Sequence, residues 1–235
     1  MKRRDFIQGA GAVLLSGLLG ANRSISARNT SYSDRPDIVR LPINKSPVRI
    51  LQFTDIHFFI RYAGDFAQSA AENAATAETL QRLTSLADPH LILVTGDFWH
   101  DNPDGKGLDF LAYGAEVMAG LKRPWIFTWG NHDQVSDLPR AHQLLKNAPG
   151  CLYAGDRSGG NYVVRIGPES QPWLELFCLN SGKEGLKQPA REWLDDVVRQ
   201  LPEYQPEHTG RVAVFHIPLR QYSAAWEHPQ ARDSK

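Results

Sequence analysis

The sequence is poor in cysteine and contains no C-x-x-C site. Its two cysteines are Cys151 and Cys178, and Cys178 lies within the apolar run WLELFCL. A disulfide would be permitted in an exported protein. Because the run around Cys178 is apolar, two buried thiols are the favoured interpretation.

The sequence also lacks an excess of charge and, in its body, a long apolar run. It has 26 basic and 26 acidic residues, so its formal net charge of zero does not indicate a nucleic-acid-binding surface. An apolar run of about 18 residues, which a polytopic membrane protein needs, is absent from the body of the chain. Neither a Gly-x-Ser-x-Gly elbow nor a glycine-rich nucleotide loop is present there, which argues against serine hydrolases and nucleotide-binding folds.

The first 30 residues differ in kind from the rest. The stretch MKRRDFIQGAGAVLLSGLLGA starts with the pair Arg3 and Arg4, continues with Asp5 and Phe6, and then becomes apolar and rich in glycine and alanine. This order predicts a twin-arginine-type signal peptide over residues 1–30 and a periplasmic or secreted protein. An amphipathic helix and an uncleaved anchor are the alternatives, so membrane contact is expected only through export or an uncleaved signal.

Strand-like and helix-like segments alternate along the remaining chain. Residues 31–46 are polar and punctuated by proline, which indicates a linker with at most one short edge strand, ahead of one domain over 47–235. Strands are expected over 48–55, 91–97, 124–129, 161–167, 173–180 and 211–216, the fourth and fifth as an antiparallel pair. Helices are expected over 66–87, 108–121, 136–147 and 189–200, with Ser136 capping the third. This alternation predicts an α/β fold, a mixed β-sheet sandwich flanked by helices.

Side chains that suit metal ions follow four of the expected strands. They are Asp55 and His57, then Asp97, then Asn131, His132 and Asp133, and finally His216. In such folds ligands bind beyond the carboxyl ends of strands. Asp55 and His57 can reach one ion because alternate side chains of an extended segment share a face. Each motif alone is weak, but their conjunction predicts a metal centre.

The order of these motifs is similar to that of a known superfamily. Asp-x-His, Gly-Asp, Gly-Asn-His-Asp and a strand ending in histidine together resemble the calcineurin-like metallophosphoesterases over about residues 48–220. FHIPL at 215–219, and LNSG at 179–182 followed by EWL at 192–194, resemble its purple-acid-phosphatase-like branch. The resemblance implies a four-layer fold in which helices flank two sheets.

The same resemblance implies roles for the residues at the strand ends. One metal ion would be held by Asp55 and His57, a second by Asn131 and His216, and Asp97 would bridge the two. His132 would face the substrate, with Asp133 orienting it. The implied function is an exported phosphoric ester hydrolase that cleaves small phosphate monoesters through a hydroxide activated by two metal ions. The metals could be Fe, Mn or Zn, and the sequence does not choose among them.

Aromatic residues in the loops over 58–72 and 98–108 leave two interpretations open. The residues are Phe58, Phe59, Tyr62, Phe98 and Trp99. They could stack on an aromatic or nucleoside group of a substrate, or they could pack the bases of the loops.

Two features depart from the family pattern. His100 stands where coloured purple acid phosphatases have a tyrosine, so a tyrosinate–iron pair is not expected. No Gly-His-x-His stretch follows His216, so the domain is expected to be C-terminally incomplete, without its last strands and with weakened metal binding. The alternative function is therefore a truncated or non-catalytic relative that binds metal or a partner without efficient hydrolysis.

Overall fold

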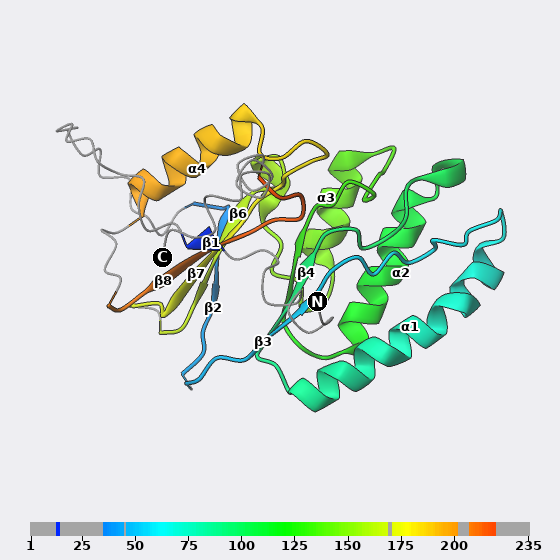
Figure 1. Ribbon diagram of the computed structural model, residues 1–235, viewed down its shortest axis with the longest axis horizontal. Coiled ribbons are helices and arrows are strands. Elements are labelled where there is room, and N and C mark those ends of the chain that lie inside the picture. Colours follow the sequence, from blue (N-terminus) through cyan, green and yellow to red (C-terminus); the bar gives the residue numbers. More distant parts are fainter. Residues whose placement is uncertain (1–12, 15–34, 45, 169–170, 202–206, 220–235) are drawn as a thin grey trace, which may run out of the picture.

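The strands of the protein form two sheets (Figure 1). The computed structural model describes residues 13–14, 35–44, 46–168, 171–201 and 207–219. The parallel sheet has the order β3-β4-β5, with bounds Ile50–Phe53, Leu91–Thr95 and Trp125–Thr128. The mixed sheet has the order β1-β8-β7-β6-β2, with bounds Val13–Leu14, Gly210–Val214, Leu174–Cys178, Tyr162–Ile166 and Ile38–Leu41.

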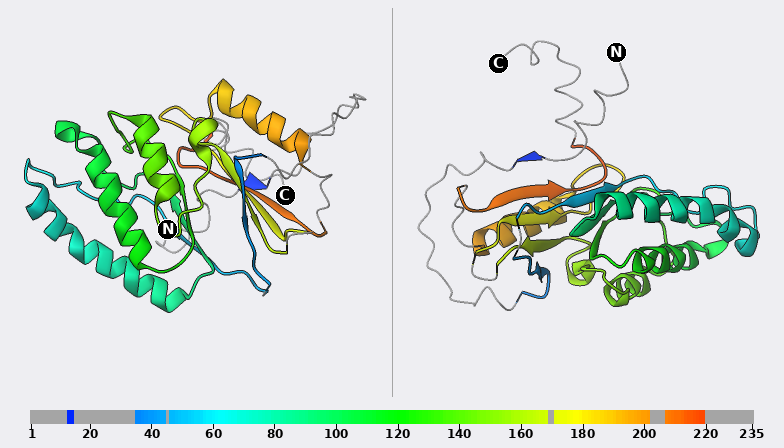
Figure 2. Two further views of the ribbon diagram at one scale, coloured as in Figure 1. Left: turned by 180° about the vertical axis from the view of Figure 1, so that it is seen from behind. Right: turned by 90° about the horizontal axis from the view of Figure 1, so that it is seen from below.

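Helices cover the outer faces of both sheets (Figures 1 and 2). Beside the parallel sheet lie α1, α2 and α3, with bounds Phe66–Ala87, Gly107–Gly120 and Leu138–Asn147. On the far side, α4 at Gln188–Gln200 covers the mixed sheet. Two short 3₁₀ helices, η2 at Pro103–Gly105 and η3 at Gly155–Arg157, lie in the connections. The order of helix, sheet, sheet and helix confirms the predicted four-layer sandwich.

Side-chain caps explain where two of the helices begin. The Asp65 carboxylate accepts a hydrogen bond from the Gln68 N–H at 3.0 Å, which satisfies a free donor at the start of α1. At the start of α3, Asp137 accepts in the same way from the Arg140 N–H at 3.0 Å. The predicted cap at Ser136 is therefore wrong by one position. Both residues are short and polar, so the sequence alone could not separate them.

Two buried clusters hold the layers together. All of β4 is buried, as expected for a parallel strand covered on both faces. Successive residues of a strand point to opposite faces of its sheet. Accordingly, Val164 and Leu176 join the cluster between the two sheets, whereas Val163 and Phe177 pack with Val197 beneath α4. The mixed sheet thus buries apolar side chains on both of its faces.

The strand β2 belongs to the folded domain. It pairs parallel with β6, with Ile38 opposite Val163. The predicted linker over 31–46 therefore carries an edge strand of the mixed sheet, and the folded region starts ahead of residue 47. The antiparallel pairing predicted for the next two strands is confirmed, with Tyr162 opposite Cys178.

Residues 1–12, 15–34 and 220–235 lie outside the described residues. The signal peptide and the loss of C-terminal strands therefore stay predictions. Within the N-terminal region, Val13–Leu14 is described and pairs antiparallel with β8.

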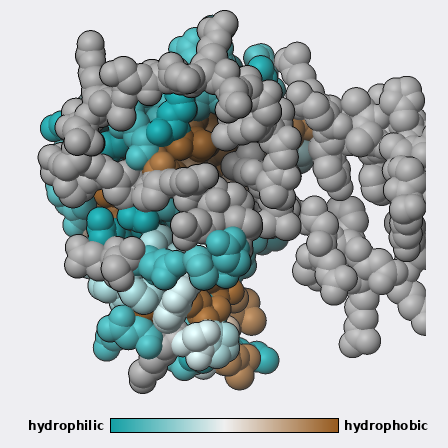
Figure 3. Space-filling view, turned by 90° about the vertical axis from the view of Figure 1, so that its left-hand side faces the viewer, coloured by the Kyte–Doolittle hydropathy of each residue, from teal (hydrophilic) through white to brown (hydrophobic). Residues whose placement is uncertain are grey.

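The described residues also show the hydropathy of the surface and the burial of the two cysteines. Among the described helices, none has the combination of length and hydrophobicity that crossing a membrane requires. Where it is described, the face shown in Figure 3 is largely hydrophilic, with apolar side chains gathered in smaller areas. Cys178 is buried and Cys151 is half-buried, and both are free thiols. Burial raises the pKa of Cys151 to about 12.

Candidate metal centre

The loops that follow the parallel strands are joined by backbone hydrogen bonds. The Asp55 N–H donates to the Gly96 carbonyl at 3.1 Å, and the His57 N–H donates to the Asp97 carbonyl at 2.9 Å. The third loop joins them through the His132 N–H, which donates to the Asp97 carboxylate at 2.9 Å. Because carboxyl ends of parallel strands share one edge of the sheet, residues far apart in the sequence meet there.

Asp97 lies at the middle of the candidate centre. Its Oδ1 accepts the hydrogen bond from the His132 N–H, and its Oδ2 faces two imidazoles. The Nε2 atoms of His57 and His216 lie 3.6 and 3.2 Å from this oxygen. Asp55 Oδ1 lies 3.9 Å from His57 Nε2. The structure therefore brings four of the five predicted ligands together, and Asn131 is adjacent through its peptide bond to His132.

The protonation of His216 follows from its neighbours. Its Nδ1 lies 2.9 Å from the Thr95 carbonyl oxygen. A carbonyl can only accept, so Nδ1 carries a proton and Nε2 is the ring nitrogen that faces Asp97. At 3.2 Å from Asp97 Oδ2, this nitrogen has room for a cation or a proton between it and the carboxylate oxygen. This arrangement, a histidine held by a carbonyl behind it, is typical of metal ligands.

The pKa of His57 supports the same interpretation. Burial lowers it below the ordinary value, Asp97 opposes that shift, and the neighbouring imidazoles of His100 and His132 add to it. A neutral imidazole is the form that binds a metal ion. The donor set of Asp55, His57, Asp97 and His216 therefore fits divalent or trivalent ions.

Backbone strain is concentrated at this edge of the sheet. Asp55, His57, Asp97 and Asp101 have φ angles of 53°, 49°, 51° and 58°. Residues other than glycine rarely adopt this left-handed region, and such strain tends to gather at functional sites. The rest of the fold thus holds these side chains in a costly arrangement.

Two glycines permit the close approach of the loops. At Gly96 (φ 87°), an added Cβ would lie 2.5 Å from Cγ of His216. At Gly130, an added Cβ would collide with the backbone N of Asp97. Glycine is therefore required at both positions by the tight packing around the candidate ligands.

A second group of side chains surrounds His132. Its ring stacks on that of His100 with centroids 4.7 Å apart and planes 15° from parallel. Its Nδ1 lies 3.0 Å from Asp101 Oδ1, which also accepts from Gln134 at 2.9 Å. Lone pairs of imidazoles lie in the ring planes, so two nearly parallel rings are poorly placed to bind one ion. The group is better suited to holding His132 in a fixed orientation.

Asp133 has a different environment from the predicted one. Its carboxylate is buried and accepts four backbone hydrogen bonds. The donors are the N–H groups of Gly130, Phe98, Asp97 and Trp99, at 2.6, 2.7, 3.0 and 3.2 Å. Burial raises the pKa of Asp133 to about 7, and the backbone hydrogen bonds oppose that shift.

The prediction that Asp133 orients His132 is therefore wrong. Asp133 joins the loops after β4 and β5, and Asp101 makes the contact with the imidazole. In the sequence, the role of Asp101 is indicated only by its position next to His100, shortly after Asp97.

The aromatic residues of the loops are mostly internal. Phe58, Phe59, Phe98 and Trp99 are buried, and Tyr62 is half-buried. Rings of this group pack on one another and on α2, as in the stacked pair of Phe59 and Phe110 with centroids 4.1 Å apart. Of the two interpretations left open, packing of the loop bases is confirmed for the four buried rings.

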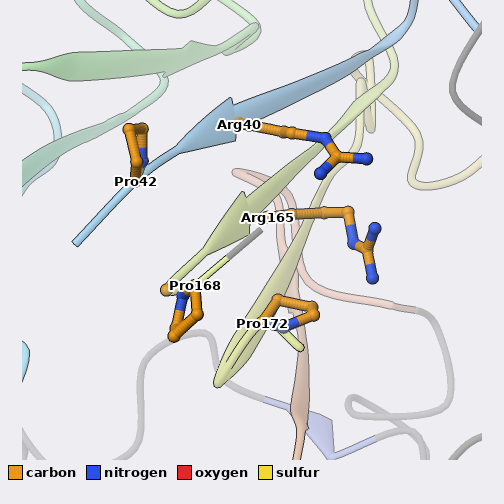
Figure 4. A pocket seen from close by; sticks show the side chains of 6 residues that line it. Arg40, Pro42, Arg165, Pro168 and Pro172 are labelled. Atoms are coloured by element: carbon orange, nitrogen blue, oxygen red, sulfur yellow. The ribbon is translucent and has the colours of Figure 1, made fainter. Parts of the chain in front are cut away.

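The protein also contains a cavity of about 140 Å³ (Figure 4). It is lined by Arg40, Pro42, Arg165, Gly167, Pro168 and Pro172, at the ends of β2 and β6. Arg165 donates to the buried carboxylate of Glu175 at 3.0 Å, and Arg211 donates to its other oxygen at 2.8 Å. The cavity shares no residue with the metal centre.

Comparison with known proteins agrees with this geometry. Residues 48–234 match the family described as Calcineurin-like phosphoesterase. An uncharacterized protein of Schizosaccharomyces pombe is 25% identical over 222 residues, covering 85% of this chain and 40% of that protein. Two Arabidopsis thaliana proteins, named probable inactive purple acid phosphatases 14 and 29, are 24% and 25% identical over 221 residues. Each of these covers 74% of this chain, which spans 54% and 55% of their lengths.

Proposed function

This chain belongs to the calcineurin-like phosphoesterase family, and from that we propose that it hydrolyses phosphate monoesters with the help of bound metal ions. The observation that carries the proposal is the convergence of the Nε2 atoms of His57 and His216 on Asp97 Oδ2, at 3.6 and 3.2 Å. Export to the periplasm or outside the cell is part of the proposal, supported by the adjacent Arg3 and Arg4 ahead of an apolar stretch.

Five side chains would hold two metal ions at this edge. They are Asp55, His57, Asp97, Asn131 and His216. Two such ions neutralise the charge of a phosphate ester and lower the pKa of bound water toward about 7. The donors are nitrogen and oxygen, which suit Fe, Mn and Zn.

His132 is positioned to act on the substrate. Its Nδ1 lies 3.0 Å from a carboxylate oxygen of Asp101, which favours a proton on Nδ1. The protonated ring can donate from Nε2 to the oxygen that leaves with the alcohol product. Its backbone N–H donates to Asp97, so the group that moves the proton is tied to the proposed bridging carboxylate.

A second function is favoured by the names of two relatives. Both Arabidopsis proteins are named probable inactive purple acid phosphatases. On that alternative this chain binds metal or a partner without efficient hydrolysis. The alternative requires the donors around Asp97 but gives His132 no task.

Turnover and metal binding, measured separately, distinguish the two functions. The full chain is assayed on p-nitrophenyl phosphate with added Mn²⁺ or Zn²⁺, and metal binding is followed by calorimetry. Hydrolysis requires metal, and His132→Ala is expected to lower kcat by about 10²- to 10⁴-fold with metal affinity retained. Asp97→Asn is expected to lose both. Metal binding with no turnover in the parent protein would support the alternative.

A further inference from the structure

Trp129 lies between the two loops that meet at Asp97. It directly precedes Gly130 and is only 4% exposed. Its ring packs edge-on against Trp99, with centroids 6.0 Å apart and planes at 78°, and Trp99 belongs to the loop that carries Asp97. On another side, an added Cβ at Gly160 would lie 2.8 Å from Cδ1 of Trp129. The indole therefore has little room to move without displacing the loop of Trp99 or the segment at Gly160.

A buried chain of hydrogen bonds fixes this ring. The Trp129 Nε1–H donates to the Tyr153 hydroxyl oxygen at 3.0 Å, and that oxygen lies 2.6 Å from Nδ1 of His142. An indole nitrogen can only donate, so the hydroxyl accepts from it. The hydroxyl proton can then be donated to Nδ1 of His142 in the tautomer whose Nδ1 carries no proton. In that tautomer the chain runs in one direction, from Trp129 through Tyr153 to His142.

Three separate elements contribute to this chain. Trp129 follows β5, His142 belongs to α3, and Tyr153 precedes η3. Tyr153 and His142 are 3% and 7% exposed. Buried polar groups that are fully satisfied specify one arrangement of a core, whereas apolar groups in the same place allow the ring to turn. The chain thus defines one orientation of the indole.

His142 remains available as the acceptor. Burial lowers its pKa, and the charged group that acts on it, Asp156, raises it. Asp156 is itself paired with Lys146 at 2.9 Å. The groups that face His142 are therefore the Tyr153 hydroxyl, the Asp156 carboxylate and the edge-on ring of Trp129.

We propose that Tyr153 and His142 are positioning residues for the candidate centre. Through Trp129 they hold the loop over residues 130–133 where the His132 N–H reaches the Asp97 carboxylate. Their effect on turnover rests on the function proposed above, whereas their effect on the loop does not.

Amide hydrogen exchange of the full chain, without added metal, tests the effect on the loop. Tyr153→Phe removes the hydroxyl and keeps the ring. The Gly130 and His132 amides, which donate to carboxylates, are expected to exchange at least about tenfold faster, with β4 amides unchanged. Tyr113→Phe is the control, because its hydroxyl donates at 3.3 Å to the Ala70 carbonyl on another element. Unchanged exchange at the two loop amides, or equal acceleration throughout β4, would overturn the proposal.

A second variant and a kinetic measurement complete the test. His142→Asn keeps an acceptor near the position of Nδ1, so its loop exchange is expected to stay close to that of the parent. With Mn²⁺ and p-nitrophenyl phosphate, Tyr153→Phe is expected to lower kcat about tenfold while KM changes less than about twofold. His142→Asn should retain most of the parent kcat. Parent-like kcat in Tyr153→Phe would contradict the effect on turnover. A parent protein without turnover would contradict the proposed function and leave the exchange result to decide the positioning.

Discussion

Two aspartates near the same histidine have opposite environments, and this difference separates their roles at the scale of single residues. Asp101 has a half-exposed side chain and contacts the His132 imidazole, whereas Asp133 is buried beneath backbone donors. Removing charge at the first should affect reactivity, because it changes which nitrogen of His132 carries the proton. Removing charge at the second should affect stability, because donors lose their acceptor.

Asp101→Asn is therefore expected to lower kcat by about 10- to 100-fold with little change in the free energy of unfolding. Asp133→Asn is expected to lower the free energy of unfolding by about 1–3 kcal/mol, since an amide cannot accept from all of these N–H groups. Steady-state kinetics and urea unfolding measure the two effects. Loss of stability in Asp101→Asn, with kcat preserved, would refute this division of roles.

The glycine next to Asp97 offers a second test at the residue scale. Gly96→Ala places a methyl group against the His216 ring and also strains a backbone with φ of 87°. Gly64 has a similar φ of 91° with nothing near its missing Cβ, so Gly64→Ala isolates the backbone strain. We expect Gly64→Ala to cost about 1 kcal/mol of stability and Gly96→Ala to cost more and abolish Mn²⁺ binding. Calorimetry measures Mn²⁺ binding and urea unfolding measures stability. Equal effects of Gly64→Ala and Gly96→Ala on both quantities would contradict the role given to Gly96.

Which site residues could be predicted depends on whether their position follows from local sequence patterns. The ligand types at the strand ends could be predicted, because Asp55, Asp97 and His216 each follow an apolar run of strand length. The family resemblance implies that Asp133 orients His132, and nothing in the sequence shows that the Asp133 carboxylate accepts from backbone N–H groups instead. The contact with Asp101 depends on a left-handed turn at φ 58°, and no sequence pattern indicates that turn.

At the scale of elements, helix α3 is linked to the candidate centre through the hydrogen bonds between His142 and Tyr153 and between Tyr153 and Trp129. Burial holds the pKa of its residue His142 below the value of 6.5 expected for an unfolded chain, so the fold favours the neutral ring. The unfolded chain therefore binds a proton more readily as the pH falls below about 6.5. The free energy of unfolding should decrease over that range and be insensitive to this group at higher pH.

His142→Asn removes this contribution and leaves other titrating groups, including His57, in place. The stability advantage of the parent over His142→Asn is expected to shrink as the pH falls from about 7.5 to about 5. Urea unfolding at a series of pH values measures it. A constant difference between the two proteins would mean that His142 does not titrate differently in the fold.

Most elements could be predicted, because their patterns are local. Helix α1 has the predicted bounds, Phe66–Ala87, and β6 and β7 pair as expected. The pairing of β2 could not be inferred, since residues 31–46 carry only a short apolar segment and its partner lies more than 100 residues away.

At the scale of the whole molecule, the centre joins the two sheets. Asp97 follows a strand of the parallel sheet, and His216 follows a strand of the mixed sheet. An ion bound by both side chains exists only in the folded state and therefore stabilises it, by about 2.7 kcal/mol when metal is at 100 times its dissociation constant. Mn²⁺ is expected to raise the thermal midpoint of the parent, and Asp97→Asn should remove the effect. An equal rise in both proteins would place the ion elsewhere.

Anomalous diffraction from crystals of the full chain soaked in Mn²⁺ tests the central claim most directly. We predict density for manganese within about 2.0–2.3 Å of Asp97 Oδ2, with Nε2 of His57 and His216 among the other ligands. Manganese bound elsewhere, or absent while these side chains remain as described, would contradict the account.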